Sequence, residues 1–186
     1  MGGYLYLVSS LPALAPDAPP PYSPEEFRFH CQGVLSAEDL AELDAVLAGR
    51  SAEGHSSFCR EWAAADTQIR NSVAKARGAA LGVEAKPFLK SHSGYRVWLD
   101  KEVTDALAKS NPLACELALD AARWKVVEEL AREEASGLPA VLAFAVKLRL
   151  AARWGAMKEE AGRARLDQLV EQLEHNAAQS GATDFK

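Results

Sequence analysis

The apolar residues of this chain recur mostly at steps of three and four, which is the spacing of amphipathic helices. The segment 56–82 is the clearest case, because its apolar positions form one stripe. The stripe consists of Phe58, Trp62, Ala65, Ile69, Val73, Ala76 and Ala80. Gly82 follows the stripe, and glycine is favoured just past the end of a helix. The pattern therefore predicts one long helix that ends near Gly82.

Several helix starts are marked by capping residues. Ser23 is followed by a proline and, three positions later, by Glu26, which is the pattern of a capping box. Ser36 is the expected cap of the next helix, which Gly49 ends. An Asn-Pro pair at 111–112 predicts another start. Between these signals, residues 84–109 are expected to be helical with interruptions.

The second half of the chain continues the helical pattern. Helices are predicted from residue 112, from about residue 138 and after Gly162. Their apolar positions are Leu113, Leu117, Trp124, Val127 and Leu130, then Val141, Leu142, Ala145, Leu148 and Ala152, then Leu166, Leu169, Val170 and Leu173. The first of these sets is expected to point inward. We predict an all-α fold of helical hairpins that form a bundle.

The N-terminal segment has a different pattern. Residues 4–8 are aromatic and branched, as in a strand, and five prolines follow before Ser23. We predict an extended proline-rich arm over residues 1–22, a helical domain over 23–178 and a frayed tail over 179–186. The arm is expected to pack on the helices and to bury four leucines, namely Leu5, Leu7, Leu11 and Leu14.

Composition narrows the function classes. The chain has 186 residues and a net charge of −5, which argues against a nucleic-acid-binding protein. Its three cysteines are widely spaced and do not indicate a disulfide framework, so a reducing cytoplasm fits best. No apolar run approaches the length of a membrane span. The first basic residue is Arg28, so the apolar start does not have the pattern of a secretion signal.

Motifs for catalysis are absent from the sequence. It contains no glycine-rich phosphate loop, no zinc-protease motif and no nucleophile elbow. The best metal candidate joins His30 and Cys31 with His55 and Cys59, the last two being spaced i, i+4. Cys59 beside His55 is also a candidate nucleophile. In the alternative interpretation the cysteines are small core residues, and the chain holds no metal, cofactor or catalytic residue.

Basic residues gather near the C-terminus. This set comprises Lys147, Arg149, Arg153, Lys158, Arg163 and Arg165. Arg149 and Arg153 are spaced i, i+4 and share a helix face. The set is either a solvated face or a contact surface for an acidic partner.

The string Ala-Ala-Arg-Trp occurs twice, ending at Trp124 and at Trp154. The two tryptophans either pack two helices together or anchor an interface, since Trp and Arg dominate binding hot spots. We therefore add Arg123, Trp124 and Trp154 to the six basic residues as predicted partner-binding residues.

Two N-terminal stretches resemble an uncharacterised bacterial family, a domain of unknown function. Residues 6–12, Tyr-Leu-Val-Ser-Ser-Leu-Pro, and residues 20–27, Pro-Pro-Tyr-Ser-Pro-Glu-Glu-Phe, are similar to the opening of its members. The stretches Ile-Arg-Asn at 69–71, Asn-Pro-Leu at 111–113 and "AFAVKLRLAARW" also resemble it. Such proteins are typically encoded beside V/A-type ATP synthase subunits. They are often regarded as relatives of the central-stalk subunit, called C in the A-type enzyme and d in the V-type.

The resemblance implies a wholly helical, non-catalytic subunit or accessory factor that couples the rotor to the membrane ring. Its partners would be protein subunits of the V/A-type ATPase, with no nucleic acid and no cofactor. It would be cytoplasmic, and peripheral at the inner membrane through the complex. One departure is that Leu150 and Arg153 stand where the stalk subunit has an Asp and an Asn. Two alternatives remain open, a helical adaptor unrelated to the pump and a metal-dependent enzyme.

Overall fold

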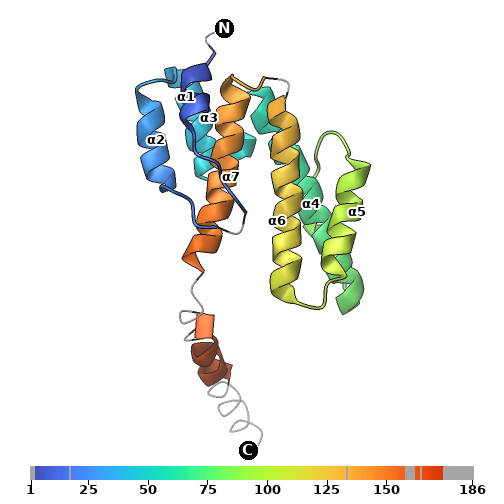
Figure 1. Cartoon of the computed structure of the whole chain (residues 1–186). Helices are drawn as coiled ribbons and strands as arrows, with labels where there is room; N and C mark the ends of the chain where they lie inside the picture. The colour runs from blue at the N-terminus through green and yellow to red at the C-terminus, as the bar shows by residue number, and fades with distance from the viewer. Residues whose placement is uncertain (1–2, 17, 133, 158–161, 164, 174–186) are drawn as a thin grey trace, which may run out of the picture.

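The computed structural model describes residues 3–16, 18–132, 134–157, 162–163 and 165–173. Within these ranges the chain forms helices and no strand, which confirms the all-α prediction (Figure 1). The elements in chain order are α1 (Leu5–Ser10), α2 (Pro24–Gln32), α3 (Ala37–Leu47), η1 (Ser51–Glu53), α4 (Ser57–Leu81), η2 (Lys86–Phe88), α5 (Val97–Leu107), α6 (Pro112–Arg132) and α7 (Leu138–Ala156). Residues 162–163 and 165–173 are also helical.

The helices form two groups that meet along α6 and α7. In Figure 1, α2 and α3 pack with α7 on one side, and α4 and α5 pack with α6 on the other. One continuous core runs through both groups. Its largest fully buried side chains include Phe27, Leu43, Ile69, Leu142 and Leu148. Each such side chain stabilises the fold by about 1.5–3 kcal/mol relative to exposure to water.

The predicted helix starts and stops are confirmed where capping residues marked them. The Ser23 hydroxyl accepts a hydrogen bond from the Glu26 amide (3.1 Å), and the Glu26 carboxylate accepts one from the Ser23 amide (2.7 Å). Ser36 caps α3 in the same way, through the amide of Asp39. Gly82 ends α4 with a left-handed backbone, at φ 66°.

The prediction of strand-like structure at residues 4–8 is wrong, because residues 5–10 form the helix α1. A strand there would leave its backbone groups unpaired, since the described residues offer no second strand, whereas a helix pairs them internally. Leu7 is buried as predicted, but Leu5 is 64% exposed and that prediction is also wrong. Leu11 and Leu14 are half-buried and pack against the core.

Residues 11–16 and 18–22, between α1 and the Ser23 cap, form no helix or strand. Pro19 lies beside Gly155 near the end of α7, where a Cβ added to the glycine would be 3.6 Å from the proline Cβ. The ring of Tyr22 lies 6.2 Å from that of Phe27 and 6.0 Å from that of Phe144. The arm is therefore packed on the bundle, although its first turns are helical. The predicted tail, residues 179–186, lies outside the described residues.

Three positions predicted to face the core do not. Ala76 and Ala80, at the end of the α4 stripe, are exposed, and so is Leu113 at the start of α6. Gly78 is buried instead, because the segment after α4 folds back against it.

Candidate functional site: a basic cleft between α4, α6 and α7

A buried carboxylate holds α6 and α7 together. Asp120 on α6 is only 1% exposed and accepts hydrogen bonds from Arg123 Nη1 (2.9 Å) and Trp154 Nε1 (2.8 Å). Arg153 on α7 donates to the same carboxylate through Nη2. A buried carboxylate is tolerated only when it is paired and hydrogen-bonded, as it is here. Two of these three partners come from α7, so the network fixes the register of α7 against α6.

Arg123 extends this network to α4. Its Nε donates to Asp66 Oδ1 (3.1 Å), and Asp66 also pairs with Arg70 Nη2 at 2.7 Å. Arg123 thus bridges two carboxylates, one on its own helix and one on α4. Because its side chain is only 17% exposed, it is held in one position.

Arg149 on α7 faces the same space and is partnered differently. Its Nη1 donates to the carbonyl oxygen of Val46 (3.0 Å), and among the described residues it forms no ion pair. Burial lowers the pKa of its guanidinium; the charge of Asp66 raises it and that of Arg70 lowers it further. The group stays protonated, because a guanidinium does not lose its proton in proteins. An anion entering this space would find a half-buried cation.

These residues line a cleft of about 590 Å³. Its charged lining consists of Asp66, Arg70, Lys90, Asp120, Arg123, Arg149 and Arg153. Five cations face two carboxylates, so the lining carries an excess of three positive charges. The buried side chain of Asn71 fixes the backbone at Lys90, donating to its carbonyl oxygen (2.7 Å) and accepting from its amide (3.0 Å). This excess of positive charge would attract an anionic group.

Of the nine residues predicted to bind a partner, the structure brings four together here. Arg123, Arg149 and Arg153 line the cleft, and Trp154 donates to Asp120 at its edge. The shared face predicted for Arg149 and Arg153 from their spacing is present. This cluster joins the basic set and the Arg-Trp strings that the sequence singled out separately.

The other predicted residues lie elsewhere. Lys147 and Trp124 both bind Glu128 Oε1, at 2.8 and 3.0 Å, and the Lys147 ammonium lies 4.9 Å from the Trp124 ring centroid. They tie α6 to α7 at a separate place. Arg163 and Arg165 lie in the helical residues beyond α7, and Arg165 donates to Gln168 (3.2 Å). Lys158 is outside the described residues.

The four metal candidates do not form a metal site. Within the described residues, no three His, Cys, Asp or Glu side chains are grouped so as to hold an ion. Cys31 and Cys59 are fully buried, and burial raises the pKa of each thiol to about 12. A thiol of that pKa is not a nucleophile at neutral pH. His30 and His55 are exposed, which agrees with the alternative interpretation of core cysteines and solvated histidines.

Sequence reasoning missed four residues of the cleft, namely Asp66, Arg70, Lys90 and Asp120. One signal for Asp120 was available, because it interrupts the apolar face formed by Leu119, Ala122 and Val126. A carboxylate at such a position requires a partner, and Arg123 is three residues away. No comparable signal marked Lys90, which reaches the cleft only because its loop is bound to Asn71.

Comparison with protein families gives one match. Residues 99–177 match the family described as "Protein of unknown function (DUF2764)". The DUF2764 region begins in α5, includes α6 and α7 and ends beyond the helical residues 165–173. It is less than half of the chain. No curated protein and no solved structure matches the chain.

The DUF2764 region contributes Asp120, Arg123, Arg149 and Arg153 to the cleft, whereas Asp66, Arg70 and Lys90 come from outside it. The cleft therefore lies where the DUF2764 region meets α4 and the loop that follows. In the part of the chain that the structure describes, no helix is both long enough and apolar enough to cross a membrane.

Proposed function

We propose that this chain is a non-catalytic subunit or accessory factor of a V/A-type ATPase or ATP synthase, and that its basic cleft binds an acidic segment of another subunit. A factor of this kind works in the cytoplasm, at the inner face of the membrane, and is held there by the complex. The identity of the complex rests on the sequence resemblance. The mode of binding rests on the cleft.

One observation carries the binding mode: the half-buried guanidinium of Arg149 has no ion pair among the described residues, in a cleft with a positive excess. Arginine presents several N–H donors in a planar fork, which suits a carboxylate. Lys90 is exposed at the same cleft. An acidic side chain placed there would meet two cations that no carboxylate of the described residues neutralises within ion-pair distance.

Neither residue supports the buried network. Asp120 is bound by Arg123, Arg153 and Trp154. Substituting Arg149 or Lys90 therefore leaves this buried carboxylate with all its partners. The variants Lys90→Glu and Arg149→Gln are therefore suitable probes of binding. Lys101→Glu on α5 is a matched control, because Lys101 is also exposed and the charge change is the same as in Lys90→Glu.

The test is to purify the tagged chain from cells that contain its natural partners and to identify the proteins that accompany it. We expect V/A-type ATPase subunits with the native chain and with Lys101→Glu. The double variant of Lys90 and Arg149 should retain at most about a tenth of them, since disrupting close charge pairs across an interface costs several kcal/mol.

Two results would contradict the proposal in different ways. If other proteins accompany the chain and are lost in the double variant, the cleft binds partners but the chain is a helical adaptor unrelated to the pump. If ATPase subunits accompany every variant equally, the chain belongs to the pump but does not use this cleft.

A further inference from the structure

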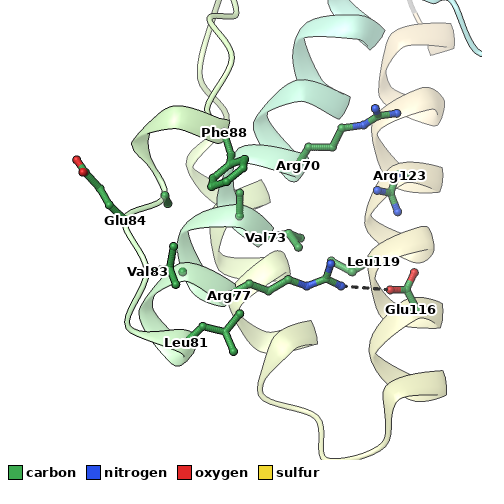
Figure 2. A pocket seen from close by; sticks show the side chains of 13 residues that line it. Arg70, Val73, Arg77, Leu81, Val83, Glu84, Phe88, Glu116, Leu119 and Arg123 are labelled. Atoms are coloured by element: carbon green, nitrogen blue, oxygen red, sulfur yellow. Dashed lines mark ion pairs between the residues drawn. The ribbon is translucent and has the colours of Figure 1, made fainter. Parts of the chain in front are cut away.

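A second concave surface lies on the other side of Arg70 and Arg123. It is a groove of about 570 Å³ between α4, α6 and the segment 83–88. Figure 2 shows Val73 and Leu81 on α4, Leu119 on α6, and Val83 and Phe88 on the crossing segment arranged around it. Leu81, Val83 and Phe88 are more than half exposed. The groove is therefore an apolar surface that the described part of the chain leaves open.

Gly78 shapes one end of the groove. A Cβ at this position would lie 2.7 Å from the carbonyl oxygen of Val83 and 3.1 Å from Ala85 Cβ. The absence of a side chain lets the segment after α4 cross close to the helix, and the amide of Val83 donates to the Gly78 carbonyl (2.9 Å). The apolar wall formed by Val83 and Phe88 is thus fixed in place.

The chain also carries an apolar helix face without a partner among the described residues. Leu166, Leu169, Val170 and Leu173 are 42–68% exposed on the helical residues 165–173. Their spacing of i, i+3, i+4 and i+7 is that of a helix that lies in a groove. In Figure 1 this helix stands beyond the end of α7, away from the bundle. The DUF2764 match continues to residue 177, so the helix is part of that region.

The groove and this helix fit one another in place and size. Arg153, near the end of α7, contacts Glu116 on the rim of the groove (3.8 Å). Residues 157–161, which follow α7, can span about 17 Å when extended. The groove follows α4 from Val73 to Leu81, and the apolar face runs from Leu166 to Leu173. At 1.5 Å per residue these lengths are about 12 and about 11 Å.

Charge agrees with the same fit. Asp167 and Glu171 are spaced i, i+4 on one flank of the apolar face. The groove has Arg70 and Arg77 on its α4 wall, and the ion pair of Arg77 with Glu116 is long, at 3.9 Å. Figure 2 shows the Arg77 side chain lying across the groove toward α6. An acidic flank of a bound helix would lie beside these arginines.

We propose that the groove is a helix-binding site and that its occupant is the chain's own helical residues 165–173, folded back from the end of α7. The bound helix covers Leu81, Val83 and Phe88 and buries its own apolar face. The groove shares Arg70 and Arg123 with the basic cleft but lies on their other side, so the inference holds whether or not the cleft binds an ATPase subunit.

The experiment is disulfide trapping in the full chain. Cys115, the one cysteine that is not fully buried, is first replaced in Cys115→Ser. Val83→Cys is then combined with Val170→Cys, which lies on the apolar face. We expect a disulfide within one chain under mild oxidation, seen as a monomer of altered mobility. The matched control combines Val83→Cys with Gln168→Cys on the polar face, and its trapping should be slower by on the order of fivefold or more.

Other occupants would give other results. A disulfide-linked dimer as the main product would mean that the groove accepts the helix of a second copy. Equal trapping of the two pairs, or none, would mean that the helix does not dock there. A dimer as the main product, equal trapping or no trapping would each overturn the proposal.

A second measurement does not depend on introduced cysteines. Leu169→Asp should release the helix and increase binding of the apolar dye anilinonaphthalene sulfonate several-fold, whereas Gln168→Asp adds the same charge to the polar face and should change it little. The rate of hydrogen exchange at the amides of Val83 and Phe88 should rise in Leu169→Asp but not in Gln168→Asp. Equal dye binding and equal exchange in the two variants would also overturn the proposal.

Discussion

Two carboxylates of this protein hold helices together through different partners. Asp120 is surrounded by arginines and a tryptophan N–H. Glu42 on α3 instead accepts hydrogen bonds from the amides of His55 and Ser56, at 2.6 and 3.1 Å, and from the Ser56 hydroxyl at 2.7 Å. Glu42 thereby ties α3 to the start of α4. Each of the two residues leads to a separate prediction.

Replacing Asp120 by asparagine should destabilise the fold strongly. The asparagine carbonyl oxygen can still accept from Trp154. The positive charges of Arg123 and Arg153, however, no longer have the negative charge of Asp120 beside them. Breaking a buried ion pair on one side costs about 3 kcal/mol. Urea denaturation of Asp120→Asn should show that loss in the free energy of unfolding. The exposed Asp105→Asn on α5 should change it by less than about 0.5 kcal/mol. Equal values would mean that the network contributes nothing to folding.

Glu42 should make stability depend on pH in the acidic range. Burial raises its pKa, but the hydrogen bonds from Ser56 and His55 outweigh burial and lower the pKa from 4.5 to about 2. The folded-state pKa is thus below the unfolded value. The stabilisation is therefore complete above pH 4.5 and is lost as the pH falls from about 4.5 toward 2.

Glu42→Gln removes this contribution. We expect a smaller decrease in the free energy of unfolding between pH 6 and pH 3 for this variant than for the native chain, measured by urea denaturation at each pH. The exposed Glu38→Gln on α3 neutralises a charge on the same helix and should follow the native chain. Parallel curves for all three proteins would be evidence against the assignment.

At the scale of elements, local signals predicted the helices whose ends are set by local chemistry. Ser23, Ser36 and Gly82 act through hydrogen bonds or backbone angles within a few residues, so their sequence context is sufficient. The helix α1 depends on packing. Its β-branched and aromatic residues favour a strand, but no strand partner is present in the described residues. Leu7 is buried only when the helix packs on the folded bundle.

The candidate site also has a part that local sequence signals predict and a part that depends on packing. The common face of Arg149 and Arg153 follows from helix geometry, so it was predictable. The meeting of Asp66 with Arg123 joins residues 57 positions apart, and no periodicity specifies it. Lys90 reaches the cleft through a loop whose conformation is set by Asn71. These contacts depend on the packing of helices, which a single sequence does not encode in a readable pattern.

Gly49 lies in the loop after α3, beside Arg149 of the cleft, and its substitution tests whether the backbone there requires glycine. It has a positive φ of 75°, and a Cβ there would lie 2.6 Å from Arg149 Nη2. Gly49→Ala should destabilise the fold by about 1–2 kcal/mol because of its left-handed backbone. Thermal unfolding should show a lower midpoint.

Gly33→Ala is the matched control. Gly33 follows α2 with φ −89°, and its Cβ would meet nothing within 4 Å. This substitution should be neutral or slightly stabilising, since alanine reduces the entropy of the unfolded chain. A similar loss of stability in both variants would contradict the proposed strain at Gly49.

At the scale of the whole molecule, α7 lies between the N-terminal helices and α6. It packs against α2 and α3 on one side and α6 on the other, and Arg149 donates to Val46, which is 103 positions earlier. The N-terminal arm covers another side of α7, where the ring of Tyr22 lies against that of Phe144 and Pro19 lies beside Gly155. The DUF2764 region thus contains α7 but not the N-terminal elements that bury it.

The docking of α1 on this bundle leads to a final prediction with an internal control. Leu7 is 6% exposed within the core, whereas Leu5, two residues earlier on the same short helix, is 64% exposed. Leu7→Ala should cost about 2–3 kcal/mol through lost burial and the cavity left behind. Leu5→Ala makes the same chemical change at a solvated position and should cost less than about 0.5 kcal/mol. Circular dichroism melting curves provide the comparison. A Leu7→Ala midpoint equal to that of Leu5→Ala would mean that α1 is not docked in solution. A midpoint well below it would mean that a segment with strand-like composition is held as a helix by its contacts with the bundle.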